Sequence, residues 1–165
     1  MKEYTQNVPN LEISEEERNG SIELMSAIFN VQSTSGDMKA MRSFIYHFIA
    51  NMGDDRIHIE SDDSGNIYVT KGRADTYPCI VSHIDTVHDI IPDEDYLVLN
   101  NGLEFFAIDL ALKRPTGIGG DDNNGIYCCL DNLVREDNIK VAFFVDEEIG
   151  CVGSSACDME FFKDV

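Results

Sequence analysis

The sequence predicts an α/β fold in which a mixed sheet is flanked by helices. Short apolar runs typical of strands alternate along the chain with longer segments of helical periodicity. Two of these runs, at 79–82 and 141–145, are continuous enough for strands that are buried on both faces. The order strand, loop, helix, strand in the second half of the 165 residues is typical of one α/β domain with a hydrophobic core.

Two helices are predicted in the first third of the chain. The first is expected over residues 21–29. The second follows the turn-like segment STSGD at 33–37 and should end near Gly53. Its apolar residues recur at helical spacing and are Met38, Met41, Ile45, Phe48, Ile49 and Met52.

Short strands are predicted next. They are IHIE at 57–60, IYVT at 67–70, CIVS at 79–82, and YLVLN and EFFAI around 96–108, which flank the hairpin-like turn NNGL. The loop TGIGGDDNNG then leads into a helix whose buried stripe should contain Ile126, Cys129, Leu130, Leu133 and Val134. The strand KVAFFV and a short helix near Gly153 complete the pattern.

The charge of the chain limits its partners. With 31 acidic and 12 basic residues the net charge is −19, which argues against a nucleic-acid backbone or an anionic membrane as partner. The first twenty residues contain no apolar segment of the kind found in signal peptides, and no run of 18 apolar residues occurs. We therefore expect a cytoplasmic protein.

The five cysteines are expected to be reduced and mostly buried. They form an odd set without a CxxC pair, which is unlike a disulfide framework or a thiolate zinc site: Cys79, Cys128, Cys129, Cys151 and Cys157. We interpret the adjacent Cys128 and Cys129 as packing residues of their helix.

Polar residues follow the apolar runs at the places where functional groups collect in α/β sheets. HIDTV follows the run at 79–82, DDNNG lies in the glycine-rich loop, and DEE follows the run at 141–145. Taken alone, each has a structural explanation: a strand-end histidine next to an acid, an N-cap before a helix, and solvated loop acids.

Taken together, the three loops indicate a metal site. Adjacent carboxylates at the end of a buried strand repel each other unless a cation, a partner or a proton holds them. One imidazole with several carboxylates suits zinc, or manganese or cobalt. With two ions roughly 3.5–4 Å apart sharing a carboxylate, an activated water can attack a carbonyl while a neighbouring glutamate takes its proton.

The motifs resemble, in type and order, those of the di-zinc exopeptidases and deacylases typified by peptidase T, the aminoacylases and the related zinc aminopeptidases. The matching segments run from Val31 to Ser154 and are STSGD, SDDSGNIYVTKG, CIVSHIDTV, GIGGDDNNGI and FFVDEEIGCVGS. The resemblance implies the zinc-exopeptidase fold, a three-layer sandwich of the phosphorylase/hydrolase-like type.

The resemblance also implies a role for each site residue, although it names no substrate-binding residue. His83 binds one metal, and Asp85, as part of the catalytic set, orients the imidazole of His83, since a carboxylate two residues away can accept its second N–H. Asp121 bridges the metals and Asp122 shapes the peptide beside it, while Glu147 is the general base and Glu148 binds the other metal.

The same resemblance bears on domain organisation. Residues 1–165 are expected to be the N-terminal part of a metallopeptidase catalytic domain that is truncated at the C-terminus. The remaining ligands, an acid and a histidine, are expected beyond Val165, together with a lid or dimerisation domain through which a full-length form could make a homodimer. We therefore expect weak metal binding and little activity from this chain alone.

The leading hypothesis is a zinc-dependent hydrolase of peptide bonds, an aminopeptidase that acts on short peptides. An N-acyl amino acid deacylase of the same family and a truncated, non-catalytic binding domain are the alternatives. Loss of hydrolysis on replacing Glu147, with metal retained, would separate an enzyme from a binding domain.

Overall fold

The computed structural model of the protein describes residues 14–165. Its elements are α1 (Glu15–Phe29), α2 (Lys39–Met52), β1 (Ile57–Ser61), β2 (Ile67–Lys71), β3 (Cys79–His83), β4 (Tyr96–Asn100), β5 (Phe105–Asp109), β6 (Arg114–Thr116), α3 (Gly120–Arg135), β7 (Ile139–Phe144), α4 (Val152–Ser155) and the 3-10 helix η1 (Met159–Phe162). Most of the N-terminal stretch in which we expect no signal peptide lies outside the described residues. Among the described helices, none combines the length and apolar character needed to cross a membrane.

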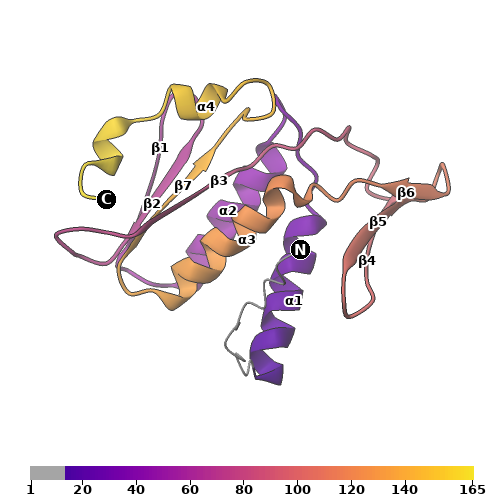
Figure 1. Ribbon diagram of the computed structural model, residues 1–165, viewed down its shortest axis with the longest axis horizontal. Helices are drawn as coiled ribbons and strands as arrows, with labels where there is room; N and C mark the ends of the chain where they lie inside the picture. The colour runs from indigo at the N-terminus through magenta and orange to yellow at the C-terminus, as the bar shows by residue number, and fades with distance from the viewer. Residues whose placement is uncertain (1–13) are drawn as a thin grey trace, which may run out of the picture.

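A mixed sheet lies at the centre of the fold, as predicted. Its four strands have the order β1-β2-β7-β3, in which β2 is antiparallel to both of its neighbours and β3 is parallel to β7. A second, antiparallel sheet of three strands, β4-β5-β6, projects from one side of the molecule (Figure 1). The predicted α/β class is therefore confirmed.

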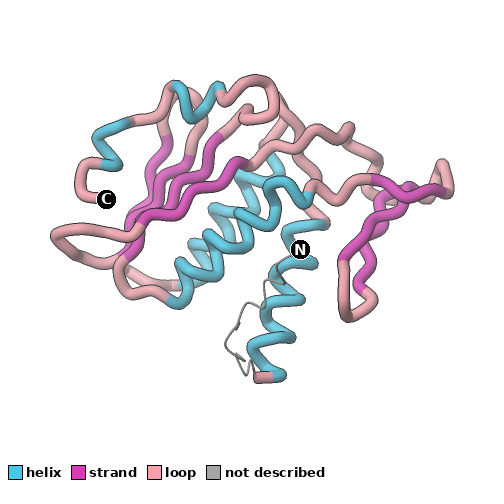
Figure 2. The backbone as a smooth tube through the Cα atoms, in the orientation of Figure 1, coloured by secondary structure: helices cyan, strands magenta, loops and turns pink. Residues whose placement is uncertain are grey.

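The main core lies between the central sheet and helices α2 and α3, which cover the same face of it (Figures 1 and 2). Alternate residues of β2 and β7 point into this core because successive side chains of a strand point to opposite faces. The largest fully buried side chains on the two sides are Ile67, Val69, Val141, Phe143, Met41, Ile45, Ile126, Leu130 and Leu133. Helix α1 packs outside, between α3 and β4.

The C-terminal segment covers part of the opposite face of the sheet. The ring of Tyr68, on β2, packs against Phe161 with ring centroids 4.9 Å apart, and Phe144 lies near Phe162. Lys140 of β7 reaches the same segment, where its Nζ donates to the carbonyl oxygen of Phe161 at 2.6 Å. Among the described residues, only the short helices α4 and η1 lie in this segment.

Several predictions of detail need correction. Strand β3 is an edge strand with Val81 51% exposed, so the run at 79–82 is not buried on both faces. Val134 is 53% exposed because it lies at the side edge of the apolar stripe that runs along α3. Helix α1 begins six residues before the predicted start, where Ser14 and Glu17 form a capping box. Strand β6 and helix η1 were not predicted.

The cysteines are free, as predicted, but most are not buried. Cys129 is buried in the core, Cys79 and Cys157 are partly exposed, and Cys128 and Cys151 are exposed. The prediction of mostly buried thiols is therefore wrong, and so is the interpretation of Cys128 as a packing residue. At about 100° per residue, Cys128 lies on the face of α3 opposite the buried Ile126, whereas Cys129 lies on the same side as Ile126.

Lys71 joins the sheet to the end of helix α3. Its side chain is 4% exposed, and its Nζ donates to the carbonyl oxygen of Leu133 at 2.9 Å and lies 3.7 Å from the carboxylate of Asp54. A buried cation at this position binds the carbonyl groups that a helix leaves unpaired at its C-terminus.

We expect Lys71→Met to lower the free energy of unfolding by about 2 kcal/mol, because charge-assisted hydrogen bonds contribute about 1.5–3 kcal/mol. Urea denaturation monitored by circular dichroism measures the change. Lys39→Met, at the exposed start of α2, removes the same charge from the surface and is the control. Equal stability of the two variants would contradict the expectation.

Candidate metal centre

The candidate residues gather where β3 and β7 end. These strands are parallel neighbours, and His83, the last residue of β3, pairs with Phe144, the last residue of β7. The glutamate pair follows three and four residues after the strand. Parallel pairing thus brings the imidazole and the two carboxylates to the same edge of the sheet.

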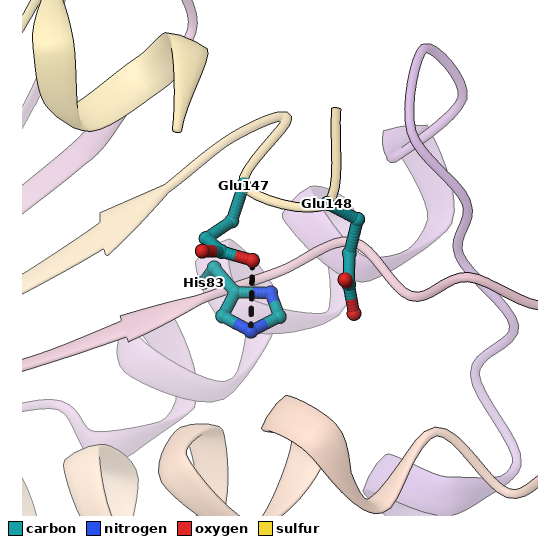
Figure 3. Close-up of side chains that lie close together, drawn as sticks. All are labelled: His83, Glu147 and Glu148. Atoms are coloured by element: carbon teal, nitrogen blue, oxygen red, sulfur yellow. Dashed lines mark ion pairs between the residues drawn. The ribbon is translucent and has the colours of Figure 1, made fainter. Parts of the chain in front are cut away.

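The side chains of His83, Glu147 and Glu148 converge (Figure 3). One ligand atom of each lies within 4.8 Å of the others, and the His83 Nε2 to Glu147 Oε2 distance is 3.9 Å. The carboxylate of Asp121 approaches the same ring nitrogen from the start of α3, with Oδ1 3.1 Å from Nε2.

The donor set and its spacing fit a divalent ion. Atoms bound to zinc at about 2.1 Å lie roughly 3.4 Å apart in a tetrahedral arrangement, so small side-chain rotations would suffice to close this group. Imidazole nitrogen and carboxylate oxygen suit zinc, manganese and cobalt. Three acids around one histidine also create the concentration of negative charge that a cation would neutralise.

Asp85 is buried next to this group and binds the backbone of Glu147 and Glu148. Its side chain is fully buried and accepts three hydrogen bonds, from the Ser35 hydroxyl at 2.7 Å and from the backbone amides of Glu147 at 2.9 Å and Glu148 at 3.2 Å. The residue also contacts His83, whose Nδ1 lies 2.9 Å from the Asp85 carbonyl oxygen and 3.5 Å from its carboxylate. The backbone carbonyl group of Asp85 is therefore nearer to the His83 imidazole than its carboxylate is, whereas the sequence suggested the carboxylate as the partner.

The ionisation of the two residues follows from these contacts. Burial opposes the charged form of Asp85, but the hydrogen bonds from Ser35, Glu147 and Glu148 outweigh it and lower the pKa of its carboxyl group. Burial likewise opposes the charged form of His83, but the carboxylates of Asp121 and Asp122, together with Asp85, raise the pKa of its imidazole. The site thus favours a cation at the imidazole position.

Asp121 and Asp122 have different environments at the start of α3. The side chain of Asp121 is 85% exposed, whereas Asp122 Oδ1 accepts from the Gly125 backbone amide at 2.9 Å. A Cβ at Gly125 would lie 2.3 Å from that carboxylate, so glycine permits the contact. Both aspartates have non-helical backbone angles and share a cis peptide bond, and the regular helix begins after them. Asp122 therefore acts as an N-cap, as the structural explanation from sequence proposed.

The structure brings together most, not all, of the predicted ligand set. His83, Glu147 and Glu148 form the group whose ligand atoms all lie close to one another. Asp121 contacts His83 but is not part of that group. The assigned roles of base, bridge and ligand remain predictions from the resemblance.

Sequence reasoning missed two contacts at this site. Ser35 binds Asp85, and the Cys151 thiol donates to Glu147 Oε1 at 3.3 Å. STSGD matched the family motifs but suggested no contact, and no pattern around Cys151 pointed to Glu147.

We expect Asp85→Asn to lower the free energy of unfolding at pH 7 by about 2–4 kcal/mol, because the amide group cannot accept all the bonds that the buried carboxylate accepts. The folded-state pKa lies below the unfolded value, so this contribution is present above about pH 4 and is lost as the pH falls through the folded-state pKa. Urea denaturation at pH 7, 5 and 3.5 should show the difference from the unmodified protein shrinking at the lowest pH. Asp75→Asn, at an exposed position, is the control; a pH-independent difference would contradict the prediction.

Comparison with known proteins identifies the fold. No model of a known family and no curated protein sequence matches the chain. Among solved structures, the chain is similar to a tripeptidase from Staphylococcus aureus (TM-score 0.69, 14% identity, covering 89% of this chain and 41% of that one). It is also similar to the aminoacylhistidine dipeptidase from Vibrio alginolyticus (TM-score 0.70, 18% identity, 91% and 32%) and to aminopeptidase PepT from Bacillus cereus (TM-score 0.63, 20% identity, 87% and 40%). The chain thus spans less than half the length of these peptidases and shares with them the zinc-exopeptidase fold that its motifs predicted.

Proposed function

We propose that the chain forms the N-terminal, metal-binding part of a hydrolase of peptide bonds, an aminopeptidase that acts on short peptides. The observation that carries the proposal is the convergence of His83, Glu147 and Glu148 at the ends of two parallel strands. The fold is shared with a tripeptidase, a dipeptidase and an aminopeptidase, which supports the same reaction class.

In this proposal His83 would hold one divalent ion and Glu148 a second, zinc in the first instance, and Asp121 would contribute to both from the start of α3. When bound, such an ion lowers the pKa of a water molecule and polarises a carbonyl group. Asp85 keeps the imidazole in place through its carbonyl oxygen and holds the backbone of the glutamate pair through its carboxylate.

Glu147 is the proposed general base. Its carboxylate is 38% exposed, so it can meet a substrate, and the Cys151 thiol holds one of its oxygens. It would take a proton from the attacking water and transfer it to the nitrogen of the leaving amine as the amide bond breaks. Glu148, whose backbone amide also donates to Asp85, is the proposed metal ligand of the pair.

The charge of the protein favours a peptide over an N-acyl amino acid. A net charge of −19 attracts the ammonium group at the free amino terminus of a peptide. An N-acyl amino acid lacks that ammonium group but keeps the carboxylate that a peptide also has, so its net charge is negative and the same field repels it. Hydrolysis of a panel of dipeptides, tripeptides and N-acetyl amino acids by zinc-loaded protein tests this preference. Absence of bound divalent metal after metal-replete purification of the natural polypeptide would overturn the proposal.

Replacement of the base should separate catalysis from metal binding. In the full-length polypeptide we expect Glu147→Gln to reduce the rate of tripeptide hydrolysis by about 100-fold or more while bound zinc, measured by elemental analysis, stays within a factor of two. Glu104→Gln, at the exposed hairpin turn, should leave both unchanged. Full activity of Glu147→Gln would remove Glu147 from this role and favour a non-catalytic binding domain.

Zinc binding should depend on pH through His83. The raised pKa keeps the imidazole protonated above its ordinary value of about 6.5, so the stabilising ion pairs are complete below that pH and are lost as the pH rises through the folded-state pKa. Zinc requires the neutral ring, so its affinity should fall as the pH is lowered from 8 to 6. Competition titration with a chromophoric chelator measures this, and His88→Gln, outside the group, should behave like the unmodified protein. A zinc affinity that stays constant over this range would contradict the prediction.

A further inference from the structure

The turn at residues 34–37 lies against both strand-end loops of the candidate metal centre. It is closed by two backbone hydrogen bonds between Thr34 and Asp37. At its tip the Ser35 hydroxyl donates to Asp85 Oδ2 at 2.7 Å, and the backbone amide of Gly36 donates to Asp146 Oδ1 at 2.8 Å. One turn thus binds a carboxylate after β3 and a carboxylate after β7.

The turn is itself firmly held. On its N-terminal side the Ser33 carbonyl oxygen accepts from the buried Thr86 hydroxyl at 2.6 Å. On its C-terminal side helix α2 begins at Lys39, and Met41 and Ile45 of that helix are fully buried in the core. The tip of the turn can therefore hold the two loops that it contacts in a fixed position.

Ser35 supplies, from its side chain, one of the hydrogen bonds that the Asp85 carboxylate accepts. Asp85 Oδ2 accepts both the Ser35 hydroxyl and the Glu148 amide, while Oδ1 accepts the Glu147 amide. Without the hydroxyl, a fully buried carboxylate would keep only backbone hydrogen bonds, with His83 Nδ1 3.5 Å away, and could rotate to find another partner. Such a rotation would release the backbone of the glutamate pair.

We propose that Ser35 is a positioning residue of the metal centre, which acts through Asp85 to hold the backbone of Glu147 and Glu148 at the distance from His83 that an ion requires. The inference rests on the proposed function and extends it to a segment outside the ligand set. Residues that orient metal ligands typically affect metal affinity by about 10–100-fold, and Ser35, one contact further away, is expected at the lower end.

Zinc titration of the full-length polypeptide tests the proposal. The dissociation constant for zinc should rise about tenfold in Ser35→Ala and stay within about threefold in Ser35→Thr, which keeps the hydroxyl group. Ser33→Ala is a matched control, because Ser33 is buried in the same segment but its hydroxyl has no hydrogen-bond partner among residues 14–165. Unchanged zinc affinity in Ser35→Ala would overturn the proposal.

Amide hydrogen exchange of the metal-free protein gives a second measurement. In Ser35→Ala the amides of Glu147 and Glu148 should exchange about tenfold faster, while the amide of Val141, in the core strand β7, keeps its rate. Equal acceleration at all three amides would indicate general destabilisation and would also overturn the proposal. If the unmodified full-length polypeptide binds no zinc, the proposed function fails, and selective exchange at Glu147 and Glu148 still decides whether Ser35 positions their backbone.

Discussion

A buried carboxylate imposes the main constraint on this structure. Asp85 is fully enclosed, and a charge in that position is tolerated only when hydrogen bonds replace the water that it has lost. The replacements come from the turn before α2 and from the loop after β7, while the carbonyl oxygen of the same residue contacts His83. Satisfying one charge therefore ties together three segments that are distant in the sequence.

The same constraint explains how acidic side chains can gather at this edge of the sheet. The backbone amides of Glu147 and Glu148 point inward to Asp85, so their side chains point away from it and toward His83. Burial opposes the charged form of the His83 imidazole, but Asp121, Asp122 and Asp85 raise its pKa, and in its protonated form the ring relieves part of the repulsion among Asp121, Glu147 and Glu148. In the proposed function a divalent ion takes over this neutralisation when it displaces the proton.

Local periodicity predicted most elements of the fold. The end of α2 at Gly53, the hairpin of β4 and β5 and the buried stripe of α3 all lie where the sequence placed them. The errors have a common origin. The exposure of Val81 depends on which strands lie beside β3, and the exposure of Val134 depends on where the sheet meets α3. Neither can be read from the residues of one segment.

The sequence by itself determined which chemical groups follow each strand: an imidazole after one apolar run, and adjacent carboxylates after another and before a helix. These depend on residue type and strand position alone. Only the tertiary structure decided that β3 and β7 are parallel neighbours, that Asp121 touches His83 but stands outside the group with Glu147 and Glu148, and that Ser35 binds Asp85. The contact between His83 and Asp121 joins residues 38 positions apart and that between Ser35 and Asp85 joins residues 50 positions apart, and their geometry is set by the packing of the elements that carry them.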